Sequence, residues 1–288
     1  MVDLGQLVPG PVAERTAPGL VALRLSDLTP QSRRETLVRP VHGGYHLLML
    51  VSVGYGRHGI DFVPYQCRPG TLLWGRPGQV HQFSPASGLD AALLLFSPDV
   101  LPAMPGLSPL TDDPFGASCW QPTGEDAEAL LTEVTQLAAD TLRYRLDDPH
   151  GGALLRHQVA VVMARIAAFA RPQPELAQSG ATDDVMARLR HELESSFALT
   201  RRVEDYAERL GCSVRTLTRA CLVATGNSAK QLVDARVALE ARRMLACTDI
   251  PVAEVGRRLG FPEPTNFGRF FVRETGATPG DFRAGIGV

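Results

Sequence analysis

Cysteine is scarce in this sequence and lysine is almost absent. The five cysteines are Cys67, Cys119, Cys212, Cys221 and Cys247. None belongs to a C-x-x-C pair, so their spacing indicates neither a zinc site nor a disulfide framework, and we expect small core residues. Lys230 is the only lysine. Nearly all the positive charge is therefore guanidinium, which matches phosphate and guanine better than an ammonium group does.

Long apolar runs are also missing. No stretch of about 18 apolar residues occurs, and the segment Val159 to Ala170 is interrupted by Arg165. Residues Met1 to Pro18 lack the basic start and apolar run of a secretory signal. We therefore predict a cytoplasmic protein with no membrane partner.

What remains is an ordinary globular composition, with 44% hydrophobic and 21% charged residues. A chain of 288 residues is long enough for roughly two domains. The net charge of -2 does not by itself suggest a nucleic-acid partner. Only local motifs can therefore indicate DNA binding.

The first part of the chain has the pattern of β-strands. Up to about Pro98, short apolar runs lie between glycine and proline turns. The predicted strands are Val21 to Leu25, Tyr45 to Val53, Gly59 to Val63, Thr71 to Trp74 and Ala91 to Phe96. An all-β barrel or sandwich fits this pattern best.

Helical spacing replaces the strand pattern from Gly124 onward. The segments Glu125 to Tyr144 and Ala153 to Ala170 predict an antiparallel helical pair. A polar, proline-rich stretch then predicts a linker at 171–182, and the chain is helical almost to its end. The predicted fold class is α+β, with a barrel and helical pair in a domain at 1–170 and an all-α domain at 183–288.

The helical part contains an internal repeat. Tyr206 to Gly211 is echoed by Val255 to Gly260, and Leu217 to Arg219 is echoed by Phe267 to Arg269. The offset is about 50 residues, and the segment Ala229 to Cys247 between the copies has no helix breaker. We expect a helix there that fixes the separation of two copies of one small unit.

Each copy has the local pattern of a helix-turn-helix. A small residue, Ala207 or Gly256, allows the second helix to cross closely, and a glycine four residues later, Gly211 or Gly260, permits the tight turn. Ser213 is a suitable N-cap for the second helix of the first copy. In the second copy the prolines restrict the corresponding helix to Glu263 to Arg273.

The helical spacing also predicts which side chains face outward. The outward residues are Arg215, Thr216, Thr218 and Arg219 in the first copy, and Thr265, Asn266, Gly268 and Arg269 in the second. Arginine forks guanine, asparagine can pair with adenine, and threonine hydroxyls reach bases or phosphate. One such copy alone would be weak evidence, because many helical hairpins share its spacing, but two matched copies favour DNA binding.

Four ordered segments resemble the signature of the AraC/XylS transcription regulators. They are Ala235 to Leu245, Ile250 to Phe261, Asn266 to Phe271 and Gly276 to Arg283. The resemblance spans about Asp183 to Arg283 and implies two recognition helices in successive major grooves of promoter DNA. By position it implies DNA contacts by Arg215, Thr218, Arg219, Pro264, Asn266 and Arg269. It also implies a homodimer, formed in many members through the helical pair; packing of that pair against the barrel is the alternative.

The first domain resembles the cupin-type barrel of sugar-responsive members of that family. The resemblance rests on His58 and on the segment Pro69 to His81. A metal-dependent cupin needs a His-x-His pair, a carboxylate and a later histidine; only His58 and His81 stand near such positions, so no metal and no other cofactor is predicted. His81 could instead be a buried histidine bonded to a backbone carbonyl, or it could contact an effector. Further effector candidates are Arg39, Tyr45 and Trp74, although a strand tryptophan is more often a core residue.

These observations predict a DNA-binding transcription regulator, not an enzyme, whose barrel binds a small-molecule effector. RNA polymerase is a further candidate partner. Two alternatives stay open at this point: a metal-dependent cupin enzyme with an appended DNA-binding domain, and a regulator that needs no effector.

Overall fold

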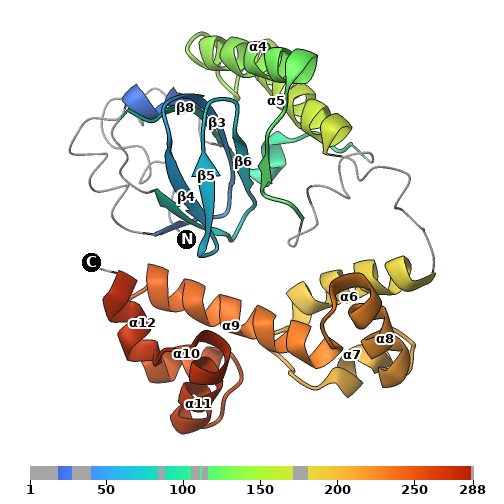
Figure 1. The fold of residues 1–288 in the computed structure, drawn as a ribbon. Coiled ribbons are helices and arrows are strands. Elements are labelled where there is room, and N and C mark those ends of the chain that lie inside the picture. Colours follow the sequence, from blue (N-terminus) through green and yellow to red (C-terminus); the bar gives the residue numbers. More distant parts are fainter. Residues whose placement is uncertain are drawn as a thin grey trace. The chain divides into compact units, whose positions relative to one another are not determined.

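The computed structural model describes residues 19–27, 40–83, 88–104, 111, 116–170 and 181–286. The described residues up to 170 and those from 181 onward form two compact units (Figure 1). Each unit has hydrophobic clusters of its own. The predicted linker lies outside the described residues except for its last two positions, which begin the first helix of the C-terminal unit.

The N-terminal unit is built on two antiparallel sheets. The five-stranded sheet has the order β1 (Leu20–Arg24), β8 (Asp90–Phe96), β3 (His46–Val53), β6 (Leu72–Gly75) and β9 (Cys119–Trp120). The four-stranded sheet has the order β2 (Val41–His42), β7 (Val80–Phe83), β4 (Gly56–Ile60) and β5 (Val63–Cys67). Short 3-10 turns, η2 (Leu25–Asp27) and η3 (Pro98–Val100), follow β1 and β8.

One predicted strand is wrong. The run Gly59 to Val63 is the end of β4, a tight turn and the start of β5. Asp61 and Phe62 form the turn with φ of 50° and 67°. Positive φ at both central positions suits the twist of a two-residue hairpin. Without a glycine at these positions, the apolar pattern hid the turn.

Alternation along β3 gives the five-stranded sheet two buried faces. Leu47 and Met49 point into a cluster shared with the four-stranded sheet. Leu48 and Leu50 point the other way, into a cluster shared with two helices. Because successive side chains of a strand face opposite sides, β3 contributes to both the barrel interior and the helix-covered face.

The predicted helical pair is present and covers the outer face of the five-stranded sheet (Figure 1). It consists of α4 (Gly124–Thr141) and α5 (Pro149–Phe169). Asp148 caps α5 by accepting the N–H of Gly151 at 2.6 Å. Among the described helices only α5 is long and apolar enough to cross a membrane, and its buried side chains pack against the sheet.

The C-terminal unit is entirely helical in its described residues. Its helices are α6 (Ala181–Ser196), α7 (Val203–Arg209), α8 (Val214–Thr225), α9 (Ala229–Cys247), α10 (Val252–Arg258), α11 (Pro264–Thr275) and α12 (Pro279–Ile286). Figure 1 shows α9 running between the group α6 to α8 and the group α10 to α12. The predicted connecting helix has the observed bounds, and the second recognition helix begins one residue later and ends two residues later than predicted.

The two copies of the repeat differ where their helices cross. In the first copy Ala207 and Leu217 are both buried in one cluster. In the second copy the partner is the larger Phe267, and a Cβ added to Gly256 would lie 2.9 Å from the Cβ of Phe267. The glycine therefore makes room for the phenylalanine, which explains why the second copy lacks the alanine of the first.

This crossing predicts that Gly256→Val lowers the free energy of unfolding of the C-terminal unit by about 1–3 kcal/mol, because the added methyl groups overpack a filled site. Thermal denaturation followed by far-UV circular dichroism measures the change. Gly268→Ala is the matched control: nothing lies within 4 Å of its added Cβ. It should be neutral, or stabilising by up to about 1 kcal/mol through helix propensity. Equal melting temperatures of Gly256→Val and wild type would show that the crossing has room for a larger side chain.

Candidate functional site

The first helix-turn-helix is formed by α7, a turn and α8. Gly211 adopts φ of 65°, a conformation that favours glycine. The N–H of Cys212 donates to the carbonyl of Ala207 at 3.0 Å, which closes the end of α7. Ser213 accepts the N–H of Thr216 at 3.0 Å and starts α8 as its N-cap, as predicted.

The second unit, α10, a turn and α11, repeats this geometry 49 residues later. Gly260 has φ of 74°, and the N–H of Phe261 donates to the carbonyl of Gly256 at 2.9 Å. Glu263 is the N-cap residue of α11 and gives no side-chain cap bond, while Pro264 occupies the first helical turn. The sequence repeat is therefore also a structural repeat.

The predicted outward residues lie on the solvent side of α8 and α11. Arg215, Thr216, Arg219, Pro264, Thr265, Asn266 and Arg269 are exposed, and Thr218 and Gly268 are partly buried. Behind them Leu217 and Phe267 are fully buried. The hydroxyl of Thr216 also lies 2.9 Å from that of Ser213, so part of its bonding capacity serves the helix start.

Charge is distributed unevenly over the two units. No described residue forms an ion pair with Arg215, Arg219 or Arg269. In contrast, Arg257 and Arg258 of α10 both bind Glu254, at 2.7 and 2.8 Å. These two arginines lower the pKa of Glu254 to about 2. Unpaired guanidinium groups therefore occur on the outward faces of both second helices, where an anionic partner can bind them.

In the N-terminal unit the two sheets bring His58 and His81 together. His58 Nε2 and His81 Nδ1 lie 3.1 Å apart, and both rings are buried. His58 also packs edge-on against Phe83, with ring centroids 4.5 Å apart. Within the described residues, His58 Nδ1 and His81 Nε2 have no hydrogen-bond partner. The interpretation of His81 as a histidine bonded to a backbone carbonyl is therefore wrong, because its partner is another histidine.

Burial keeps both histidines neutral. It lowers the pKa of His81 to about 4, against a smaller opposing effect of Asp61. It also lowers the pKa of His58, and His81 adds to this effect. Buried polar nitrogens without partners cost about 1–3 kcal/mol each. A bound molecule with hydroxyl or carbonyl groups could form the missing bonds.

The other effector candidates are distributed over different places. Tyr45 belongs to the cluster between the two sheets, on the same side as the histidine pair. Trp74 is fully buried on the opposite face, where its Nε1–H donates to His46 at 3.2 Å. It is therefore a core residue between sheet and helices, separated from the barrel interior. Arg39 lies outside the described residues.

A metal centre would need more ligands than these two histidines supply. No group of three or more His, Cys, Asp or Glu side chains suited to a metal ion occurs among the described residues. A pair of imidazoles alone does not provide the set expected of a metal-dependent barrel.

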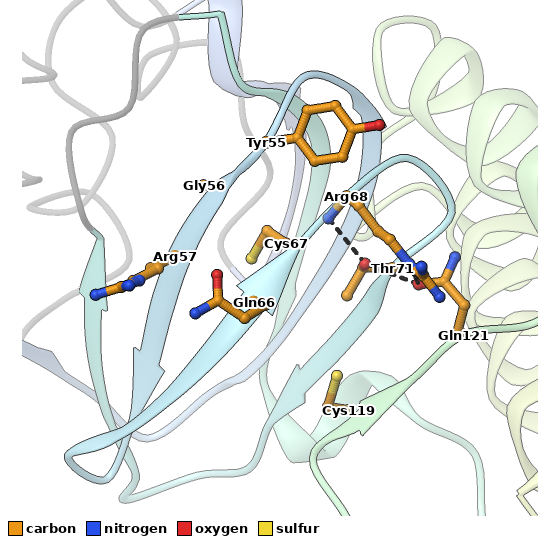
Figure 2. Close-up of a pocket in the computed structure, with 9 residues that line it drawn as sticks. All are labelled: Tyr55, Gly56, Arg57, Gln66, Cys67, Arg68, Thr71, Cys119 and Gln121. Atoms are coloured by element: carbon orange, nitrogen blue, oxygen red, sulfur yellow. Dashed lines mark hydrogen bonds between the residues drawn. The ribbon is translucent and has the colours of Figure 1, made fainter.

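A cavity of about 690 Å³ opens between the sheets beside this interior (Figure 2). It is lined by Tyr55, Gly56, Arg57, Gln66, Cys67, Arg68, Thr71, Cys119 and Gln121. Gly56 is paired with Cys67 in the β4–β5 hairpin, and both residues border the cavity. His58 lies two residues further along the same face of β4. The volume is within the range of small-molecule sites.

Polar groups line one wall of this cavity. Gln121 accepts hydrogen bonds from Thr71 Oγ1 at 3.0 Å and from Arg68 Nε at 3.2 Å. Burial, together with nearby Cys119, raises the pKa of the Cys67 thiol to about 11, so this thiol is neutral. None of these residues was a sequence-based candidate. Their convergence depends on strand register and on β9, whose two residues are too few to form a recognisable strand pattern.

Comparisons with known families match both units. Residues 206–285 match the family described as a helix-turn-helix domain, and residues 30–156 match the family described as an AraC-like ligand binding domain. One similar relative is the HTH-type transcriptional activator RhaR of Enterobacter sp. (strain 638), 26% identical over 244 residues that cover 82% of this chain and 83% of the relative. Another is the HTH-type transcriptional activator RhaS of Salmonella schwarzengrund (strain CVM19633), 27% identical over 250 residues, with 85% and 87% covered. These relatives are activators, in agreement with the expectation of a regulator and not an enzyme.

Solved structures also resemble the chain. ToxT from Vibrio cholerae O395 is 10% identical, with a TM-score of 0.46, 86% of this chain covered and 91% of that one. The DNA-binding domain of AdpA, solved in complex with a target DNA, is 32% identical, with a TM-score of 0.32, 37% of this chain covered and 93% of that one.

The histidine burial predicts a pH dependence of the N-terminal unit. Below pH 6.5, the ordinary pKa of histidine, His81 is protonated in the unfolded chain but stays neutral in the folded state. The free energy of unfolding therefore decreases as the pH falls toward the folded-state pKa of about 4. At pH 5 the loss due to His81 alone is about 2 kcal/mol. Thermal unfolding can be followed by tryptophan fluorescence, because both tryptophans, Trp74 and Trp120, belong to this unit.

His81→Asn should reduce the difference in thermal stability between pH 7 and pH 5, independently of its effect on stability at pH 7. His157→Gln changes an exposed histidine of α5 and serves as the control, which should keep the wild-type slope. A wild-type melting temperature that does not change between pH 7 and pH 5 would show that the buried histidines do not titrate as argued.

Proposed function

The chain belongs to the AraC family of transcriptional regulators, and from this premise we propose that it binds promoter DNA through α8 and α11 and regulates transcription in response to a small molecule. The observation that carries the proposal is the matched pair of outward faces whose arginines have no ion-pair partner among the described residues. Arg219 and Arg269 occupy equivalent positions, 50 residues apart in the repeat.

Each recognition helix carries a different set of readers. On α8, Arg215 and Arg219 can fork guanine, and Thr218 can reach a base or a phosphate. On α11, Arg269 can fork guanine and Asn266 can pair with adenine, while Thr265 supplies a hydroxyl. Pro264 has no donor and contributes apolar contact only. Thr216, which is partly engaged by Ser213, is the weakest reader of the set.

We place the effector in the cavity beside the β4–β5 hairpin, with its polar end near the histidine pair. A polar ligand with hydroxyl or carbonyl groups is supported by the hydrogen-bonding groups around Thr71 and Gln121. It is also supported by the nitrogens of His58 and His81 that have no partner in the part of the chain that the structure describes. An effector changes DNA binding only if it binds one arrangement of the protein better than the other.

The outer face of α5 supports a homodimer. Leu154 and Val161 are seven residues apart on this helix and are 41% and 40% exposed, although the opposite face is fully buried against the sheet. Packing against the barrel and pairing with a second copy are therefore compatible, since they use different faces. A two-fold dimer would present two DNA-binding units to two half-sites.

The site of action follows from the target. A regulator of promoter DNA works in the cytoplasm, and we propose this location for the chain. Activation, with RNA polymerase as a partner, is the outcome we propose because the relatives RhaR and RhaS are named as activators.

Footprinting of the purified protein on the DNA upstream of its own gene tests the proposal. We expect two protected major-groove segments about one helical turn apart on one face of the DNA, with affinity falling steeply as salt rises. Arg269→Ala should weaken specific binding by about 1–3 kcal/mol and relax preference at one base pair, if Arg269 forks a guanine. Arg145→Ala, which removes an exposed arginine of the N-terminal unit, is the charge-matched control.

Two results would contradict this assignment. Equal affinity of Arg269→Ala and wild type for the protected site would remove Arg269 from the readers. A uniform loss on all sequences, with a salt slope lower by about one, would make it a phosphate contact instead.

The effector site predicts a ligand-dependent stabilisation of the N-terminal unit. In a panel of sugars and small carboxylic acids, a true effector at about 100 times its dissociation constant should stabilise the unit by roughly 2.7 kcal/mol, read by tryptophan fluorescence. Cys119→Phe obstructs the cavity without adding a tryptophan and should abolish this shift, while Cys247→Phe in the C-terminal unit should retain it. A shift that survives Cys119→Phe would place the ligand elsewhere.

A further inference from the structure

The C-terminal unit has a second connection between its two helix-turn-helix units, besides α9. It is the loop of residues 197–202 between α6 and α7, which directly precedes the first helix-turn-helix. This loop contacts residues 260–261, which form the turn of the second helix-turn-helix. The loop before the first helix-turn-helix therefore holds the turn of the second helix-turn-helix in place.

The start of this loop is anchored to α9. Phe197 packs against the hydrophobic clusters of both units. The guanidinium of Arg236 lies 3.9 Å from the centroid of the Phe197 ring, and it is held by Glu194 at 2.6 Å and Glu240 at 3.0 Å. Because Arg236 is 4% exposed, this charged group is fixed by its partners and cannot follow alternative positions in solvent.

At the end of the loop, Arg201 contacts the turn of the second helix-turn-helix. Its guanidinium lies 3.6 Å from the centroid of the Phe261 ring, and Nη2 donates to the carbonyl of Gly260 at 3.2 Å. A planar guanidinium can stack flat on the ring while an in-plane N–H donates to a carbonyl, whereas the ammonium group of lysine has no plane with which to stack. The approach is close on a second side as well, since a Cβ at Gly260 would lie 3.2 Å from the carbonyl oxygen of Ala198.

We infer that Arg201 is a positioning residue that fixes the second recognition helix relative to the first, and so sets the spacing of base pairs the protein accepts between its two DNA subsites. This inference rests on the proposed DNA-binding function. Phe261 packs against Phe267 and Phe270 of α11, with ring centroids 5.3 and 4.9 Å apart, so a displacement of this turn displaces the helix that carries Asn266 and Arg269.

The geometry of DNA makes such a constraint selective. Insertion of one base pair between two subsites moves the second by about 3.4 Å along the axis and rotates it by about 35°. Two helix-turn-helix units that are held rigidly cannot both reach their subsites after this displacement. Two units that are joined only through α9 can shift relative to one another and reach both. Rigid coupling raises affinity for the matching spacing and lowers it for the others.

Arg202 provides a matched control next to Arg201. It carries the same charge, but its side chain is 74% exposed and pairs with Glu204 and Asp205 at the surface. Arg202→Ala therefore removes one positive charge from the same loop without touching Phe261. Arg201→Lys keeps the charge and loses the combined stacking and hydrogen bond.

The test compares the full-length wild type, R201A, R201K and R202A on three duplexes that carry the footprinted site with its native spacing, one base pair added or one removed. We expect wild type and R202A to lose at least about tenfold in affinity on the altered spacings, because one head loses its base contacts. R201A should lose less than about threefold, with a weaker affinity at the native spacing. R201K should lie between the two.

A DNA-free measurement separates this inference from the proposed function. Amide hydrogen exchange of residues 256–263 should be at least about tenfold faster in R201A than in wild type and unchanged in R202A, because the turn loses its outer contact. Suppose that neither wild type nor any variant binds DNA specifically, but R201A still shows the faster exchange. The proposed DNA-binding function is then wrong, and the contact by which Arg201 holds the second turn is confirmed. Unchanged exchange, or equal spacing preference of R201A and wild type, overturns the inference. A salt slope of R201A lower by about one also overturns it, because Arg201 would then be a phosphate contact.

Discussion

The close crossing of two short helices at a residue with little or no side chain is the constraint on which the C-terminal unit depends. Neither α7 nor α10 is long enough to be stable alone, since each has seven residues. Each is held because Ala207 or Gly256 lets the following helix approach and bury its apolar face. Once that face is buried, the helical period leaves the opposite face, with Arg219 or Arg269, in solvent.

The two copies satisfy this constraint with different residue pairs. Alanine crosses a leucine in the first, and glycine crosses a phenylalanine in the second. The summed volume at the crossing is kept roughly constant, as packed interiors require. The aromatic pairs of Phe261, Phe267, Phe270 and Phe271 then build the second core around that exchange. The two copies therefore differ in sequence at the crossing but are packed to a similar density there.

In the N-terminal unit the corresponding constraint is strand alternation. β6 carries Leu73 and Gly75 toward the barrel interior and Trp74 toward the helices. The ring of His81 occupies the space over Gly75, where a Cβ would lie 1.9 Å from its Cε1. One strand thereby supplies both the core that holds α4 and α5 and the gap that accepts the histidine pair. A ligand that rearranged this pair would act on the same sheet that supports the helices.

Local patterns in the sequence determined the helices, caps and turns of the C-terminal unit, because helical period, Ser213, Gly211 and Gly260 act within a few residues of one another. They also determined the outward residues, since these follow from the buried ones. Only the tertiary structure decided the hairpin at Asp61 and Phe62, the pairing of His58 with His81, and the cavity bordered by Cys67 and Gln121. The histidine pair and the cavity depend on register between strands distant in the sequence, where a shift by one residue moves every side chain to the other face. The hairpin is local, but neither of its central residues is a glycine, so the apolar pattern did not reveal it. The contact of Arg201 with Phe261 was also decided only by the tertiary structure, because no local sequence pattern indicates that these two residues lie close together.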